Sequence, residues 1–149
     1  MGIKIIAKNK RAHFDHFLKD MFEAGLMLKG TEIKSIRLGK ANIQDAFVSI
    51  DKSMQAWLHN MLIPTYEFGN RFNHEEKRKR KLLLHAAEIK KIYDKMRQEA
   101  LTVIPTKLYF KGSYVKIEIA LAKGKRTHDK RETLKKKDVE RKLKQGKYE

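Results

Sequence analysis

Cysteine is absent from this chain of 149 residues, and proline and tryptophan are scarce. The lack of cysteine excludes a disulfide framework and a zinc site with cysteine ligands. It is compatible with a reducing cytoplasm, where we expect the protein to act. No apolar run approaches the roughly 20 residues of a membrane-spanning helix, so we expect no membrane partner. Residues 1–6 are too few and too soon charged to predict a signal peptide.

Basic side chains are abundant instead, with 35 Lys and Arg against 18 Asp and Glu, a formal charge of +17. From Lys123 onward there are 12 basic and 5 acidic residues but few aliphatic ones. We therefore predict a basic tail over 123–149, disordered when free because it has little to bury. Residues 1–122 keep a net charge of +10 and are predicted to form one domain. Charge on both parts indicates a large polyanion as partner.

Hydrophobic patterning predicts a mainly β body with helices, built from about six strands. Residues 1–12 are expected to be a basic lead-in, and residues 13–28 a strand, a bend at Gly25 and a second strand. Alternating apolar residues predict a hairpin over 46–63, with its turn at 51–53. The same alternation predicts two final strands, over 101–110 and 114–122. These strands suit a small, partly open β-barrel of the oligonucleotide-binding (OB) type.

One short and one long helix are predicted between these strands. Thr31 can cap a short helix that Gly39 ends. Asn73 followed by Glu76 predicts the start of a helix that continues to about Ala100. The basic run at 77–81 would then lie in its first turns, where positive charge opposes the helix dipole. RNA phosphates would neutralise that charge, so we expect this run to contact RNA.

No set of residues predicts catalysis. His13 and His16 form the only close histidine pair, and on a strand they would face opposite sides. No acid/base spacing is found among the carboxylates of Asp15, Asp20, Glu23 and Glu32. Phosphate-binding glycine loops and nucleophile motifs are also missing from the sequence. We expect no enzyme, no metal and no cofactor, and an RNA-cleaving nuclease is disfavoured by the missing carboxylate cluster.

Several sequence blocks recur in an order that is typical of one bacterial family. They are NKRA at 9–12, EAGL at 23–26, GTEIKS at 30–35, GKAN at 39–42, RKRKLLLH at 78–85, LYFK at 108–111, ALAKGK at 120–125 and DKR at 129–131. With these blocks the chain resembles the small protein B family, the partners of transfer-messenger RNA (tmRNA). The resemblance covers nearly the whole chain.

The resemblance implies an OB-type barrel that acts as an RNA-binding adaptor in trans-translation. Such a protein binds the tRNA-like domain of tmRNA and delivers it to the A site of stalled ribosomes, with elongation factor Tu in the delivery complex. It assigns tmRNA binding to Asn9, Lys10, Glu32, Lys34, Arg78, Arg80, Lys81, Leu83, Leu84 and His85.

The resemblance also implies a role for the tail, which would probe the decoding centre and become helical in the empty mRNA channel. The tail residues it assigns to this role are Lys123, Gly124, Lys125, His128, Asp129, Lys130, Arg131, Lys135 and Lys136. The alternative that the residues leave open is a ribosome-associated structural RNA-binding protein without a tagging role.

Overall fold

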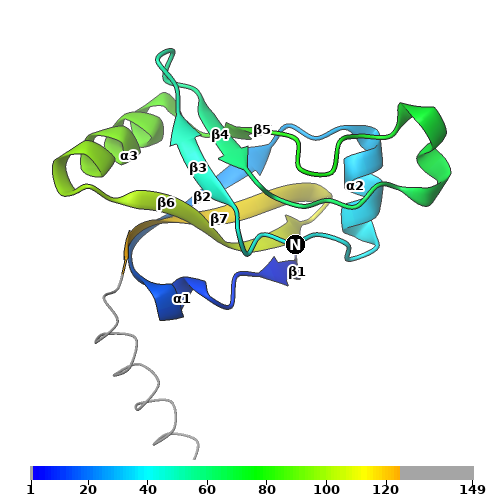
Figure 1. The fold of residues 1–149 in the computed structure, drawn as a ribbon, viewed down its shortest axis with the longest axis horizontal. Helices are drawn as coiled ribbons and strands as arrows, with labels where there is room; N and C mark the ends of the chain where they lie inside the picture. The colour runs from blue at the N-terminus through cyan, green and yellow to red at the C-terminus, as the bar shows by residue number, and fades with distance from the viewer. Residues whose placement is uncertain (1, 125–149) are drawn as a thin grey trace, which may run out of the picture.

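A computed structural model describes residues 2–124 of the chain, which form a β-barrel flanked by helices (Figure 1). The strands are β1 (Ile3–Lys8), β2 (His16–Leu26), β3 (Phe47–Ile50), β4 (Ala56–His59), β5 (Arg80–Leu83), β6 (Thr102–Lys111) and β7 (Tyr114–Gly124). The helices are α1 (Ala12–Asp15), α2 (Gly30–Arg37) and α3 (Ala86–Glu99), with a 3₁₀ helix over Glu67–Phe72.

The sheet closes on itself through antiparallel pairs. The strand order is β1-β6-β3-β4-β5-β2-β7, and a further pairing between β6 and β7 completes the ring. Strand β6 is long enough to pair with β3 at Val103 and with β1 from Lys107 to Lys111. Closure pairs every strand of the ring on both sides, and β1 is added outside the ring on β6. The predicted OB-type class is confirmed. Two of the seven strands, β1 and β5, were not predicted, and the two strands predicted over residues 13–28 are one strand, β2.

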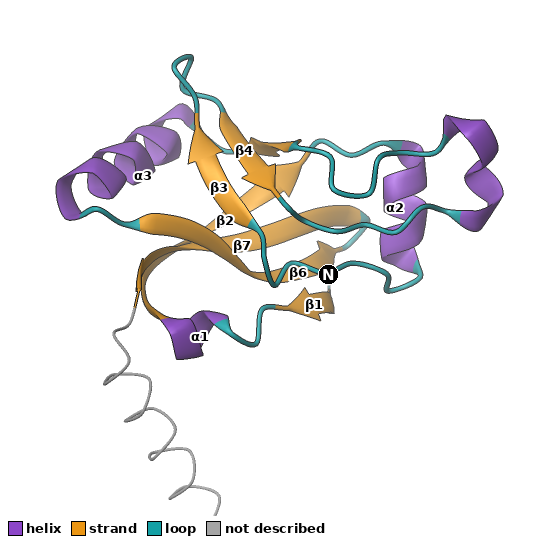
Figure 2. Ribbon diagram, in the orientation of Figure 1, coloured by secondary structure: helices purple, strands orange, loops and turns teal. Residues whose placement is uncertain are grey.

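The barrel interior is filled by the inward side chains of alternating positions, which was the pattern that predicted the strands. On β7, Ile117, Ile119 and Leu121 are fully buried, as are Leu58 on β4 and Leu108 on β6. Helix α2 adds Ile36 and helix α3 adds Ile92 to the same core. The two helices lie on opposite sides of the barrel (Figure 2). Burial of these side chains is the main stabilising contribution to the body.

The N-terminal quarter differs from its prediction. The expected lead-in contains strand β1, whose Ile3 and Ile5 stay exposed because β1 lies outside the closed ring. Residues 13–28 form the end of α1 and one long strand, β2, instead of two strands with a bend. The irregularity in β2 lies between Leu18 and Met21, where the register with β7 shifts. Gly25 marks a close approach, since a Cβ there would lie 3.3 Å from Cβ of Leu83.

The prediction of a long helix from Asn73 to about Ala100 is wrong for the first half of that range. Strand β5 occupies positions 80–83, and α3 begins only after His85, whose N–H donates to the Glu88 carboxylate at 3.1 Å. Asn73 does not cap a helix, because its amide pairs with the backbone of Tyr66. The short helix was predicted correctly, although Lys29 precedes its first residue in place of Thr31. Gly39 ends it with a φ of 75°, in the left-handed region that glycine tolerates.

The last strand extends past the predicted boundary of the body. Lys123 pairs with Phe17 and Gly124 with His16, so the two residues belong to the barrel and extend it beyond residue 122. Pro105 lies inside β6 at a register shift between Pro105 and Lys107. Proline lacks a backbone N–H, and a bulge is where a strand accepts that loss.

Candidate RNA interface

A buried ion pair joins α2 to β5 at the centre of the predicted RNA-binding region. The side chains of Glu32 and Arg80 are both 0% exposed, and Arg80 Nε donates to a carboxylate oxygen of Glu32. Arg80 also donates to the backbone carbonyls of Met61 at 2.7 Å and Glu76 at 3.1 Å. The guanidinium therefore links helix α2, the segment after β4 and the turn before β5. Its planar fork suits such multiple acceptors better than an ammonium group would.

Arg78 covers this pair from the solvent side. Its Nη2 donates to Glu32 Oε1 at 2.6 Å and to the carbonyl of Met27 at 3.3 Å. The Lys29 N–H donates to the same carboxylate oxygen at 2.7 Å. Burial alone would raise the pKa of Glu32, but the hydrogen bonds from Arg78, Lys29 and Arg80 outweigh it and hold that pKa below its usual value. Glu32 is therefore an anion whose acceptors are already occupied.

The basic run at 77–81 alternates between the two sides of the chain. Arg80 points into the protein and Arg78 is largely covered, whereas Lys77 and Lys79 are exposed and Lys81 is half-buried. This period of two is the mark of a strand, and a helix would have distributed the five side chains around its axis. The two arginines are hydrogen-bonded within the protein, and the lysines lie on the opposite, outer side.

A shallow groove runs beside this strand. It is lined by Gly25, Lys81, Leu83, Leu84, His85 and Lys116, and also by Glu23 and Glu88. Leu83 is half exposed and His85 is exposed, so both present rings or methyl groups to solvent. Cationic and apolar side chains in one groove suit a nucleotide, whose phosphate is anionic and whose base is flat and apolar on its faces.

The remaining predicted residues of the body lie in two other places. Asn9 is buried, where its N–H donates to Thr106 at 2.8 Å and its Nδ2 to Pro105 at 3.0 Å. Lys10 is exposed beside it and lines a hollow with Lys8 and the segment 41–44. Lys34, on α2, has its Nζ 5.4 Å from the centre of the Tyr66 ring.

The structure thus gathers four predicted residues, Lys81, Leu83, Leu84 and His85, into one groove, and places Glu32 and Arg80 beneath the surface. Both of those side chains are 0% exposed in this structure, and contact of either one with RNA stays a prediction. Of the tail residues, Lys123 and Gly124 end β7. The others predicted lie outside the described residues: Lys125, His128, Asp129, Lys130, Arg131, Lys135 and Lys136.

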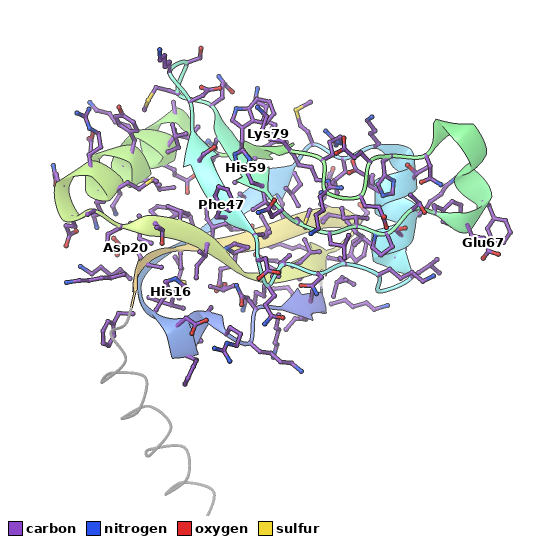
Figure 3. All side chains as sticks on the ribbon, viewed as in Figure 1. His16, Asp20, Phe47, His59, Glu67 and Lys79 are labelled. Atoms are coloured by element: carbon purple, nitrogen blue, oxygen red, sulfur yellow. The ribbon has the colours of Figure 1, made fainter. Side chains whose placement is uncertain are left out.

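Aromatic side chains on β3 and β4 were missed by the sequence reasoning. Phe47, Trp57 and His59 lie on the outer face of the barrel, close to Lys79 (Figure 3). The signal that could have found them is the alternation of the hairpin, which sends 48, 56 and 58 into the core and so directs 47, 57 and 59 outward.

Two further properties of residues 2–124 bear on function. No group of three or more His, Asp or Glu side chains in this part of the chain could hold a metal ion. Nor does any of its helices have the length and apolar character needed to cross a membrane.

The closed barrel and the basic run at 77–81 define a small basic β-barrel protein with a surface suited to RNA. The sequence matches the profile of the family described as SmpB protein over residues 6–148. The chain belongs to the SmpB protein family.

Similar proteins extend along almost the whole chain. The SsrA-binding protein of Carboxydothermus hydrogenoformans is 54% identical over 140 residues, which is 94% of this chain and 93% of the relative. That of Geotalea uraniireducens is 52% identical over 141 residues, covering 95% and 93%. A solved structure described as "tmRNA-SmpB: a journey to the center of the bacterial ribosome" contains a chain that is 39% identical. It superimposes with a TM-score of 0.68 and covers 86% of this chain and 93% of that one.

Proposed function

We propose that this chain is an RNA-binding adaptor that binds the tRNA-like domain of tmRNA and acts in trans-translation at stalled ribosomes. The observation that carries this function is identity of about half of all positions with SsrA-binding proteins along nearly their full length. The tmRNA-SmpB chain, which shares the fold, supports the same RNA and the ribosome as partners. Such an adaptor works by binding and positioning, and it requires no catalytic group.

Within the body, we assign RNA contact to the groove beside β5. Lys81 supplies charge, while Leu83, Leu84 and His85 supply apolar and ring surface next to it. Lys10 and Lys34 are further cations at exposed positions, and partly exposed Arg78 borders the same strand. Glu32, Arg80 and Asn9 are assigned a positioning role, because each is buried and fixes backbone that carries the exposed residues. Counterion release by these cations would supply much of the affinity.

The tail is assigned a separate task on the ribosome. Its charge of +7 over residues 123–149 suits the RNA-lined decoding centre and the empty mRNA channel. Delivery to the A site with elongation factor Tu, and action in the cytoplasm, belong to the same proposal. The structural alternative without a tagging role is not favoured, because the relatives are named for the SsrA RNA that they bind.

A comparison of the full chain with a chain ending at Gly124 tests this division. We expect equal affinity for a tRNA-like-domain fragment of tmRNA, and loss of peptide tagging on stalled ribosomes in the shortened chain. Full-length tRNA serves as the competitor that measures preference. Equal affinity of the full chain for tRNA and tmRNA would contradict the proposed partner. Lost tmRNA affinity in a shortened chain with an unchanged melting temperature would contradict the assignment of RNA binding to the body.

A further inference from the structure

Six outward side chains form a regular grid on β3, β4, β5 and the residue just before β5. The strand register places Phe47 opposite His59 and Ser49 opposite Trp57, and it pairs Trp57 with Lys81. Continuing that antiparallel register by two residues brings Lys79 beside His59. We call Phe47, Ser49, Trp57, His59, Lys79 and Lys81 the ring grid. Its members Phe47, His59 and Lys79 lie together on the upper part of the barrel in Figure 3.

The rings of the grid are held in place by specific contacts. Phe47 and His59 stack with centroids 4.8 Å apart and planes 10° apart. The Ser49 hydroxyl lies 2.6 Å from His59 Nε2. Trp57 Nε1 donates to Asp51 at 2.9 Å, and the Lys79 ammonium lies 4.4 Å from the Trp57 ring centre. These contacts fix the rings before any ligand arrives, which lowers the entropy lost on binding.

Phe47 nevertheless remains 43% exposed, although it is a large apolar side chain. In a face-to-face pair each ring has one face outside the pair, so a third flat ring can extend the stack. The imidazole is neutral near pH 7, because burial and the charge of Lys79 lower the pKa of His59. The pair therefore presents flat, uncharged rings with ammonium groups at its side.

We propose that the ring grid binds unpaired RNA bases, which stack on Phe47 and its neighbours while Lys79 and Lys81 contact the adjoining phosphates. Sequence-tolerant binding of single strands combines such ring surfaces with a flanking line of positive charge. The site goes beyond the tmRNA contact proposed above, with which it shares Lys81 but no residue of β3 or β4.

The charge of the surroundings favours RNA as the occupant. A stacked cross-strand pair by itself stabilises a hairpin and needs no ligand. Here two lysines flank three rings in a chain of charge +17, so a polyanion with flat apolar groups complements the grid better than a protein surface would. Duplex RNA does not meet this requirement, because its bases are stacked within the helix and turn only their edges outward.

The single tryptophan of the chain provides a direct readout, because Trp57 is itself part of the grid. We expect saturable quenching of Trp57 fluorescence when the full chain is titrated with a single-stranded oligoadenylate of six nucleotides. An RNA duplex of equal length should bind more weakly and leave the fluorescence nearly unchanged. Equal quenching by the duplex, or single-strand binding without quenching, would overturn the proposal.

Removal of the stacked pair provides the second test. The double variant Phe47→Val, His59→Val keeps β-branched residues on the strands, and we expect it to lose about fivefold or more in affinity for the single strand. Tyr114→Val is the matched control, since Tyr114 is an aromatic residue 69% exposed on β7, outside the grid. Unchanged affinity in a double variant that melts at the wild-type temperature would overturn the proposal.

The source of the bases is resolved by two more titrations of the double variant, with the tRNA-like-domain fragment and with isolated small ribosomal subunits. A loss confined to the fragment places the unpaired bases in tmRNA, and a loss confined to the subunits places them in ribosomal RNA. No loss with either RNA would overturn the proposal for the natural partners. The proposed tmRNA function is tested separately: equal affinity of the wild-type chain for tmRNA and tRNA would contradict that function without bearing on the ring grid.

Discussion

Glu32 and Arg80 stand 48 residues apart in the chain and form an ion pair in which neither side chain is exposed. A charge without water must be compensated by its neighbours, and here each partner has further hydrogen bonds beyond the pair itself. The pair therefore fixes α2 against β5, and with it the orientation of Lys81 on the outer side of β5 and of Lys79 just before it.

Glu32→Gln should destabilise the body strongly. The substitution leaves Arg80 charged and buried without its counterion, a change that typically costs about 3–5 kcal/mol. The free energy of unfolding from urea denaturation measures the loss. Asp45→Asn is the control, because it neutralises an exposed carboxylate. Equal stability of the two variants would contradict the role assigned to the pair.

Acid should weaken the folded state through the same carboxyl group. The pKa of Glu32 is held below its ordinary value of 4.5, so the unfolded chain takes up this proton at higher pH than the folded chain. The ionised Glu32 carboxylate therefore stabilises the folded state fully above about pH 4.5, and this stabilisation is lost as the pH falls further. Unfolding curves between pH 6 and about pH 3 should therefore show a shallower pH dependence for Glu32→Gln. A parallel dependence in both proteins would count against this assignment.

Arg80→Lys should fail as a conservative change, whereas Lys81→Arg should be tolerated. An ammonium group cannot reach Glu32, Met61 and Glu76 together as the guanidinium fork does. We expect a loss of about 3 kcal/mol for Arg80→Lys and less than about 0.5 kcal/mol for Lys81→Arg at its half-buried position. Thermal melts of the two single variants compare these effects at equal net charge. A well-folded Arg80→Lys protein would show that charge alone suffices.

Tyr109 should make the stability of the folded state depend on pH in the alkaline range as well. The side chain is buried and its hydroxyl donates to the Glu23 carboxylate, so burial and this neighbour raise the pKa of Tyr109. In the unfolded chain the phenol ionises near pH 10. The stabilisation of the folded state by the protonated Tyr109 hydroxyl is therefore present below that pH and is lost as the pH rises. We expect Tyr109→Phe to cost about 1–2 kcal/mol at neutral pH and to flatten stability above pH 10. Absorbance titration at alkaline pH should show that Tyr109→Phe has one fewer ionisation-resistant tyrosine than the wild-type chain.

The sequence predicted those elements whose pattern is local. The hairpin of β3 and β4, the strands β6 and β7 and the helix α2 follow from alternation or capping within a few residues. The sequence was misleading at β5, because a run of five charged residues hides the period of two that apolar residues would have shown. Burial of Arg80 depends on Glu32, and no local pattern indicates that distant partner.

The predicted binding residues divide in the same way. Lys81, Leu83, Leu84 and His85 were adjacent in the sequence and share one groove in the fold. The family resemblance assigned Glu32 to RNA binding, and in the structure its acceptors are occupied by Arg78, Arg80 and Lys29. The ring grid was missed because its rings come from separate strands and only the register brings them together.

The alternation of arginine and lysine at 77–81 has a consequence for how this segment tolerates change. Deletion of one residue just before the run would shift the frame by one position and exchange its two faces, turning lysines inward and arginines outward. Such a protein would keep its net charge, pI and composition of basic residues almost unaltered. It would nonetheless lose both the buried ion pair of Arg80 with Glu32 and the outward lysines. The number of residues in this segment is therefore constrained more tightly than the identity of any exposed residue in it.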